Sequence, residues 1–346
     1  MRYGLVCLQN LKRKYVIKLK ALIVGYGSIG KRHVQNLLNY STIEIIVCSK
    51  KKQDSFLKKN HCLVIKSLKK CIKENPDFAI ISNVSSSHMK TAIELADAGI
   101  HLFIEKPLSH NETGIKKLQN IVKRKKLITL MGCHLRFHPC IIKIKEILEK
   151  KKIGRVLVVK AENSSFLPDW HPFEDYRQNY TAKKELGGGV LLTSIHELDY
   201  LYWLFGKVNN IFSITEKISD LQLSSNDFSA ILIKFKGGIT GEIHLDFFQR
   251  SRIRECKIIG TKGIIHCDLN LNKIKLYNQT TKKWTMKLNL KKYNQNEAYK
   301  KELEHFINCI HNNKSSINDL TEGAKVLKIA LAAIKSSRNR KMVLIK

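Results

Sequence analysis

ALIVGYGSIGKRHV, residues 21–34, places three apolar residues before a turn that contains three glycines. The apolar run at 22–24 predicts a short buried strand, and the segment from Ser28 onward predicts a helix. A helix that begins directly after such a turn presents unpaired N–H groups and a partial positive charge to an anion. We therefore expect a dinucleotide-binding domain in which the pyrophosphate contacts Gly25, Tyr26, Gly27, Ser28, Ile29 and Gly30.

Each glycine of this turn has a separate expected role. Gly25 permits the sharp turn, Gly27 keeps a Cβ away from the phosphates, and Gly30 lets the helix pack closely on the strand. Three glycines also occur by chance in ordinary tight turns. The strand before them and the helix after them favour dinucleotide binding over that alternative.

The overall composition is that of a soluble globular protein with two domains. The chain has 346 residues, 43% of them apolar, and a mean hydropathy of −0.22. No apolar run approaches the roughly 20 residues of a membrane span, and the run from Leu5 to Leu8 is too short for a signal peptide, so we expect a cytoplasmic protein with no membrane partner. The nine cysteines include no CxxC pair, which favours buried free thiols over disulfides or a metal site. We predict an extension at 1–16, a Rossmann domain at 17–134 and a substrate-binding and oligomerisation domain at 135–346.

The formal net charge of +33 raises the alternative of nucleic-acid binding, which predicts an affinity that falls steeply with salt. The lysines are spread along the whole chain rather than gathered in one patch. Because Lys, Ile and Asn all have AT-rich codons, drift in base composition explains the charge more simply. We expect no nucleic-acid partner, although a basic surface favours anionic substrates.

The predicted second strand, 44–48, ends where the choice between NAD and NADP is usually made. An acidic residue at that place binds the ribose hydroxyls of NAD, whereas basic residues suit the 2′-phosphate of NADP. This chain has Ser49, Lys50, Lys51 and Lys52 there, with no carboxylate before Asp54. The sequence therefore favours NADP(H) over NAD(H), with contacts from Ser49 and Lys50.

Two later strands of the first domain also end in polar residues. The strand at 78–82 precedes Asn83, and the strand at 101–104 ends in Glu105-Lys106-Pro107. The carboxyl ends of parallel strands border the cofactor site, so Asn83, His88, Glu105 and Lys106 are predicted cofactor contacts. His88 equally suits the role of capping and orienting the helix at 88–98.

Lys106 is a candidate for proton transfer. A nearby cation or a dry pocket lowers the pKa of a lysine, and this position overhangs the expected cofactor site. Pro107 restricts Lys106 to extended geometry, and their peptide bond is a candidate for the cis form. Read alone, the residue is better explained as a surface lysine before a turn.

The segment after residue 135 begins with a helix at 139–151 and a strand at 155–162. The loop at 164–189 is crowded with aromatic and charged residues, as binding loops and lids often are. Its candidate substrate contacts are Trp170, His171, Asp175, Tyr176 and Arg177; the alternative is a surface loop that packs on itself. Three glycines at 187–189 then open a predicted helix that ends at Gly206 and carries Leu192, His196, Asp199 and Trp203 on one face.

From residue 211 the pattern changes to alternating strands joined by short turns. We predict strands at 211–218, 228–236, 239–248, 253–259, 263–269, 273–278 and 283–288, followed by helices at 296–311 and 321–336. The expected fold class is α/β plus α+β, a doubly wound parallel Rossmann sheet with a second domain built on a large, mostly antiparallel sheet. One open face of that sheet is a natural subunit interface, so we expect a homodimer or homotetramer.

Together these motifs resemble the Gfo/Idh/MocA family, the group of glucose-fructose oxidoreductase and inositol dehydrogenase. The resemblance covers nearly everything after residue 18 and is carried by the glycine turn, Glu105-Lys106-Pro107 and GGGVLLTSIHELDYLYWLFG at 187–206. It implies an NAD(P)-dependent oxidoreductase that moves a hydride between nicotinamide and a carbinol or ketone carbon of a sugar or nucleotide sugar. The stretches 167–177 and 196–200 look most similar to members linked with bacterial surface-carbohydrate biosynthesis.

The resemblance also implies roles for single residues. Lys106 is the expected catalytic lysine and His196 the general acid/base, with Asp199 placed to orient His196. Arg136 joins the loop residues as a predicted substrate contact. The family usually has an aspartate three or four residues before the histidine, where this chain has Leu192 and Thr193. That departure favours the alternative of a catalytically impaired, cofactor-binding regulator or scaffold.

Overall fold

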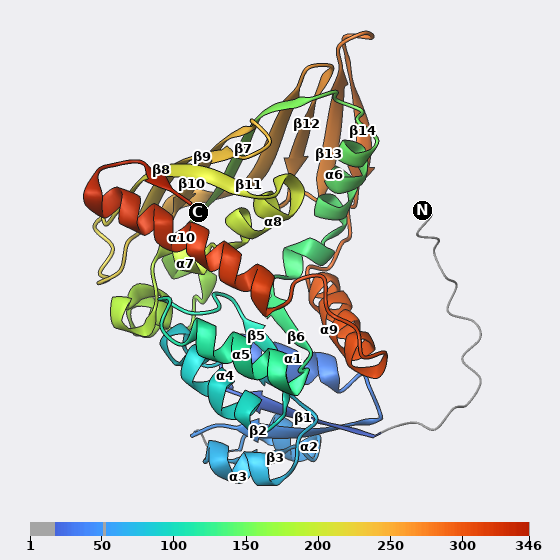
Figure 1. Cartoon of the computed structure of the whole chain (residues 1–346), viewed down its shortest axis with the longest axis vertical. Helices are drawn as coiled ribbons and strands as arrows, with labels where there is room; N and C mark the ends of the chain where they lie inside the picture. Colours follow the sequence, from blue (N-terminus) through green and yellow to red (C-terminus); the bar gives the residue numbers. More distant parts are fainter. Residues whose placement is uncertain (1–17, 51–52, 346) are drawn as a thin grey trace, which may run out of the picture.

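The computed structural model describes residues 18–50 and 53–345, so the predicted extension at 1–16 and the residues Lys51 and Lys52 lie outside the described residues. Two sheets organise the described part of the chain (Figure 1). Helices surround the first sheet, and the broad second sheet forms the other end of the molecule. The expected fold class is confirmed.

The first sheet is parallel throughout and has the strand order β3-β2-β1-β4-β5-β6. Its order reverses between β1 and β4, and open α/β sheets bind their ligands at such a switch point. The strands are β1 (Leu19–Val24), β2 (Ile43–Cys48), β3 (Leu63–Ile65), β4 (Phe78–Ile81), β5 (His101–Glu105) and β6 (Thr129–Gly132). The helices are α1 (Ser28–Leu37), α2 (Ser55–Lys59), α3 (Leu68–Lys73), α4 (His88–Asp97) and α5 (Ile115–Lys125).

The second sheet has nine strands in the order β14-β13-β12-β11-β7-β10-β9-β8-β15. Every neighbouring pair is antiparallel except β7 and β10. The strands are β7 (Val156–Phe166), β8 (Val208–Glu216), β9 (Phe228–Phe235), β10 (Thr240–Asp246), β11 (Phe248–Gly260), β12 (Gly263–Asp268), β13 (Lys273–Asn278), β14 (Lys283–Asn289) and β15 (Val343–Leu344).

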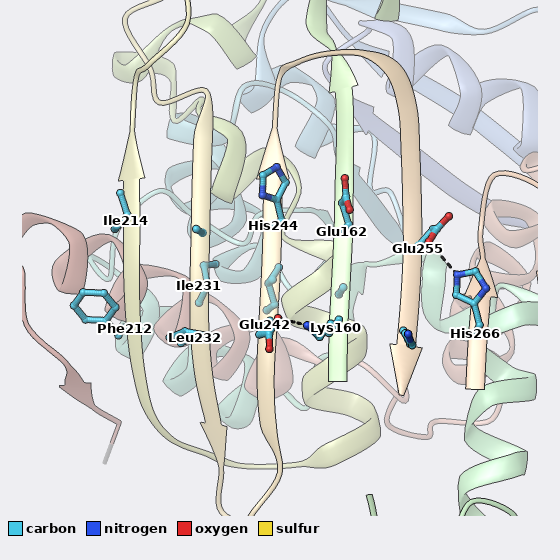
Figure 2. Close-up of a pocket in the computed structure, with 14 residues that line it drawn as sticks. Lys160, Glu162, Phe212, Ile214, Ile231, Leu232, Glu242, His244, Glu255 and His266 are labelled. Atoms are coloured by element: carbon cyan, nitrogen blue, oxygen red, sulfur yellow. Dashed lines mark hydrogen bonds and ion pairs between the residues drawn. The ribbon is translucent and has the colours of Figure 1, made fainter. Parts of the chain in front are cut away.

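One face of the second sheet is covered by helices, and the other face is open (Figure 2). The helices of this part are α6 (Pro139–Glu149), α7 (Val190–Thr193), α8 (His196–Phe205) and α10 (Leu320–Asn339). The open face holds a cavity of 520 Å³, beside which the side chains of Ile214 and Leu232 are about half exposed. Lys160 and Glu242 form a 2.8 Å ion pair across this face. Within the described part of the chain, no helix combines the length and apolar character needed to cross a bilayer.

Helix α9 (Asn296–His311) follows the second sheet in sequence but packs on the first. The ring of Phe306 meets those of Phe78 and Phe103 edge-on, with centroids 5.7 Å away in each case. Asn296 also donates a 2.7 Å hydrogen bond to Asn36 of α1. A segment of the expected second domain therefore forms part of the hydrophobic core around the first sheet.

The helix predicted across 190–205 is two helices, α7 and α8, with a break at Ser194 and Ile195. In a continuous helix the Thr193 carbonyl would accept from the N–H of Glu197. Here that carbonyl accepts a 2.8 Å hydrogen bond from Lys106 Nζ, and the N–H of Glu197 bonds the Ser194 carbonyl at 3.4 Å. The break therefore coincides with a contact between α7 and the end of β5.

Candidate active site

The glycine turn has the shape that a pyrophosphate requires. Gly25 has a φ of +97°, and a Cβ there would lie 2.6 Å from the Asn83 nitrogen. A Cβ on Gly30 would lie 2.2 Å from the Gly25 carbonyl oxygen, whereas one on Gly27 would meet nothing within 4 Å. Gly25 and Gly30 are thus required by the packing of the chain itself, and Gly27 leaves open space at the N-terminus of α1, where no side chain caps the helix. These residues fit a dinucleotide.

His88 is placed to hold the chain rather than a cofactor. Its ring is buried, with Nδ1 2.8 Å from the Pro107 carbonyl oxygen and Nε2 3.0 Å from that of Asn83. Burial lowers the pKa of His88. The ring joins the ends of β4 and β5, which supports the predicted orienting role. The Asn83 amide donates to Thr91 at 3.0 Å.

The end of β2 presents Ser49 and an exposed Lys50. Asp54 accepts a 2.9 Å hydrogen bond from the Leu57 N–H and so caps α2. Burial and the neighbouring Asp54 raise the pKa of Tyr26 to about 12. The first carboxylate after β2 is therefore already engaged by the protein.

Glu105 and Lys106 point to different partners. Glu105 is buried and lies 2.7 Å from His33 Nε2, which ties β5 to α1. The Lys106–Pro107 peptide bond is cis, and Lys106 Nζ reaches the Thr193 carbonyl three residues before His196. The amine and the imidazole predicted to share the chemistry are thus held on adjoining segments.

His196 begins α8 and is 6% exposed. Its ring meets His134 edge-on at 4.6 Å, and His134 stacks on Tyr299 of α9 at 4.0 Å. Burial is the main cause that holds the pKa values of both histidines well below the usual range. The charges of Arg254 and Lys106 lower both pKa values further, and His134 also lowers that of His196. His196 Nδ1 has no hydrogen-bond partner among the described residues. Both rings are neutral at pH 7, so His196 is free to accept a proton.

Arg254, on β11, completes this group. Its Nε lies 2.8 Å from the buried Glu197 carboxylate, and its positive charge helps to depress the pKa of both histidines. We call Lys106, His134, His196 and Arg254 the basic cluster. It combines residues from β5, the turn after β6, α8 and β11, so both sheets contribute to it.

Two expectations are corrected by a buried ion pair. Arg136 donates to Asp199 through Nη2 at 2.7 Å and through Nε at 2.9 Å, and its Nη1 donates to the Ile317 carbonyl. Both side chains are buried. Asp199 therefore does not orient His196, and the guanidinium of Arg136 has no face left for a substrate. His196 and Asp199 are one turn apart in α8, as predicted, but the Asp199 carboxylate pairs with Arg136, which is distant in the sequence.

The aromatic loop mostly contacts itself and its surroundings. Trp170 donates to Ser165 at 2.9 Å, and Arg177 pairs with Asp175 at 2.8 Å. The Tyr176 hydroxyl accepts from the Gln222 N–H, while the His171 side chain is partly exposed. These contacts match the alternative of a self-packed loop and do not place the side chains in the basic cluster. Short 3-10 turns run through this loop at Leu167–Trp170, Tyr176–Gln178, Tyr180–Ala182 and Lys184–Leu186.

Several residues near the basic cluster were not predicted from the sequence. They are His134, Arg254, Glu197, Tyr299 and Glu302. Glu302 is fully buried without a hydrogen-bond partner among the described residues, and burial raises its pKa well above the usual range. Of these, only His134 could have been selected from the sequence, since it lies two residues before Arg136 and directly after a buried strand. The others belong to segments that only the tertiary fold brings close to the basic cluster.

The cavity on the open face of the second sheet is a separate feature. Glu255 and Lys257 of β11 line it, and side chains alternate along a strand, so Arg254 points to the other face. Figure 2 shows the ion pair of Lys160 with Glu242 on this face. The cavity is therefore not the candidate active site.

Comparison with known proteins gives matches over almost the whole described chain. Residues 19–133 match the family described as "Oxidoreductase family, NAD-binding Rossmann fold", and residues 145–345 match "Oxidoreductase family, C-terminal alpha/beta domain". Myo-inositol 2-dehydrogenase of Thermotoga maritima is 24% identical over 335 residues, which are 93% of this chain and 97% of that protein. The scyllo-inositol 2-dehydrogenase (NAD(+)) of Bacillus subtilis is 24% identical, with 93% and 95% covered.

Solved structures show the same fold. A levoglucosan dehydrogenase in complex with NADH has a TM-score of 0.85 at 17% identity, covering 95% of this chain and 99% of that one. A putative NADPH-dependent oxidoreductase from Desulfitobacterium hafniense has a TM-score of 0.83 at 17% identity, covering 94% and 97%. At these identities the likeness concerns the fold alone.

Proposed function

The chain belongs to the Gfo/Idh/MocA oxidoreductase family, and from that premise we propose that it transfers a hydride between nicotinamide and a carbinol or ketone carbon of a sugar, cyclitol or nucleotide sugar. The observation that carries the proposal is the contact between Lys106 Nζ and the Thr193 carbonyl. It brings the amine at the carboxyl end of β5 beside the segment that leads into His196. The relatives named as inositol dehydrogenases agree with this substrate class.

The residues present divide the work of the reaction. Oxidising a carbinol removes a hydride from carbon and a proton from oxygen, and the bound nicotinamide would supply the hydride acceptor. Gly25, Gly27 and Gly30 with the start of α1 would hold its pyrophosphate. The neutral imidazole of His196 takes the hydroxyl proton, and the Lys106 amine donates a hydrogen bond to the substrate oxygen. In the direction of ketone reduction the same two groups return the proton.

We propose that NADP(H) is preferred over NAD(H). Ser49 and the exposed Lys50 stand where the adenosine ribose is bound in this fold, and Asp54 is occupied as the cap of α2. A 2′-phosphate would meet a cation there and no free carboxylate. Among the solved structures with this fold, one is described as a complex with NADH and another as an NADPH-dependent oxidoreductase.

We also propose that the protein forms a homodimer or homotetramer through the open face of the second sheet. Exposed Ile214 and Leu232 give that face apolar area, and charged pairs such as Lys160 with Glu242 surround it. The similarity of 167–177 and 196–200 to members linked with surface carbohydrates extends the proposal to nucleotide sugars from that metabolism.

The test is a turnover assay on the purified protein, following the absorbance of the reduced nicotinamide. Sugars, cyclitols and nucleotide sugars are each offered with NAD⁺ and with NADP⁺, and cofactor binding is measured separately by fluorescence. We expect turnover of at least one class, with NADP⁺ the better cofactor. Cofactor binding with no turnover across the panel would instead support the regulator or scaffold that the Thr193 position favours, and absence of both would contradict the proposed function.

A further inference from the structure

The Arg254 side chain has a hydrogen-bonding group that the protein leaves unused. Its Nε pairs with Glu197, but its Nη2 is buried with no acceptor among the described residues. The side chain is only 12% exposed. A guanidinium nitrogen that is shielded from water and lacks a partner is costly to the fold. An acceptor supplied by a ligand removes that cost.

The charges around Arg254 leave a positive excess. Lys106 bonds a carbonyl and forms no ion pair within residues 18–50 and 53–345, and Arg252 adds a second guanidinium near Arg254 and Glu197. Arg32 lies over the Tyr299 ring at 4.6 Å. Among the nearby carboxylates, Glu197 pairs with Arg254, Glu105 with His33 and Asp199 with Arg136. Burial raises the pKa of Glu302, the remaining one, which favours its uncharged form.

Two further atoms near Lys106 also lack partners in the described chain. Thr193 Oγ1 and His196 Nδ1 are both buried and unpaired. Lys106 contacts the Thr193 carbonyl, and Lys106 and Arg254 both lower the pKa of His196, so a hydroxyl, an imidazole nitrogen and a charged donor lie in one neighbourhood. A hydroxyl of a neutral polyol also accepts a hydrogen bond from Nη2, but a carboxylate or phosphate forms a stronger, charge-assisted bond with the guanidinium, so a ligand with several hydroxyls and one anionic group fits this set best.

We propose that the substrate is an anionic sugar whose carboxylate or phosphate is bound by Arg254 Nη2, while its reacting carbinol lies at Lys106 and His196. This inference rests on the proposed function and specifies its substrate class. The anionic group belongs to the substrate rather than to the dinucleotide, because Arg254 lies on the second sheet and the glycine turn on the first. Guanidinium groups bind carboxylates and phosphates alike, so the experiment separates these two sources.

The experiment measures binding by calorimetry to the full chain saturated with NADPH. The probes are pairs in which one member carries a carboxylate or phosphate that the other lacks: glucose with glucuronate, glucose with glucose 6-phosphate, and myo-inositol with its monophosphate. We expect an anionic member to bind at least about tenfold more tightly than its neutral partner. A preference for glucuronate identifies a carboxylate, and a preference for the phosphates identifies a phosphate. Equal or tighter binding of every neutral member, or no binding of any anionic probe, overturns the inference.

Variants show whether Arg254 is responsible. Arg254→Gln should abolish the anion preference, so that the anionic member binds no more tightly than its neutral partner. Because that variant leaves Glu197 buried without its partner, the double variant R254Q/E197Q provides a folded alternative with the same expected loss. Arg155→Gln, at an exposed arginine before β7, removes the same charge far along the sheet and should keep the preference. Retention of the preference in R254Q/E197Q would overturn the assignment.

The outcomes for the two proposals are separable. Turnover of neutral polyols without an anion preference leaves the oxidoreductase function intact and removes this inference. Anion binding that depends on Arg254, in a protein that binds no nicotinamide cofactor, supports the anion site and contradicts the oxidoreductase function.

Discussion

The glycine turn and the basic cluster form the two halves of the proposed site, and they are built in opposite ways. The turn uses six consecutive residues whose shape is set by contacts within a few residues and with Asn83. The basic cluster draws its four residues from four segments that are distant in the sequence, and α9 supports it through Tyr299. A function encoded in a local motif is thus robust to changes elsewhere, whereas one assembled from distant segments depends on the ion pairs that hold those segments.

The largest expected effect is on chemistry in the basic cluster. Lys106→Ala should lower kcat by about 10³-fold, since general acid–base groups contribute on the order of 10²–10⁴, and should leave cofactor affinity within about twofold. Steady-state turnover and cofactor fluorescence measure the two quantities. Lys90→Ala, at an exposed lysine of α4, is the matched control, and equal activity of both variants would remove Lys106 from the mechanism.

The next effect concerns the support of the cluster. Asp199→Ala leaves the buried Arg136 guanidinium without its carboxylate, so the free energy of unfolding should fall by about 3–5 kcal/mol. Urea denaturation measures this loss. Asp175→Ala breaks the exposed pair with Arg177 and should leave the denaturation midpoint unchanged. A midpoint for Asp199→Ala equal to the parent would mean that the pair contributes no support.

Two glycine substitutions separate packing from ligand space within the turn. Gly30→Ala places a Cβ 2.2 Å from the Gly25 carbonyl oxygen, so it should lower the free energy of unfolding by about 1–3 kcal/mol. Gly27→Ala meets no protein atom and should keep stability but weaken cofactor binding by about tenfold. Thermal melting and cofactor titration distinguish them. If Gly27→Ala binds cofactor as the parent does, the pyrophosphate does not lie against this residue.

The smallest expected effect is the pH dependence of stability. His88, His134 and His196 have pKa values lowered in the folded state, so the unfolded chain binds more protons once the pH falls below about 6.5. The contribution of these histidines to stability is therefore complete above that pH and is lost below it, by up to about 1.4 kcal/mol per pH unit for each histidine that stays neutral in the fold.

His134→Phe keeps a ring against Tyr299 and removes one of these groups. In a plot of unfolding free energy against pH, the slope between about pH 6.5 and 5 should decrease by the contribution of one bound proton. His61→Asn, outside the buried set, should leave the slope unchanged. Denaturation series at several pH values provide the measurement, and identical slopes for His134→Phe and the parent would argue against a neutral His134.

The sequence was sufficient for features that depend on near neighbours. Glycine spacing predicted the turn from Gly25 to Gly30, and alternation predicted the strands of the second sheet. The three-residue strand β3 was missed because it is too short to show a pattern. The break between α7 and α8 was missed because it coincides with a contact from the amine of Lys106, which lies 87 residues away along the chain.

The candidate site was harder to predict because its charged side chains pair with residues that are distant in the sequence. Asp199 is one turn from His196 in a helix, and helical spacing alone suggested that they interact. The carboxylate instead pairs with Arg136, 63 residues earlier, and nothing in the local pattern distinguishes the two partners. Arg254 was missed for the same reason, since its meaning comes from the orphaned Nη2 atom and the surrounding charges.

The return of α9 to the first sheet determines how this chain can be divided. A fragment ending at residue 134 would leave Phe78 and Phe103 uncovered, because the ring that seals them belongs to Phe306. An isolated Rossmann fragment is therefore expected to aggregate unless a peptide spanning 296–311 is supplied in trans. Complementation by such a peptide would make the protein a natural candidate for a split reporter.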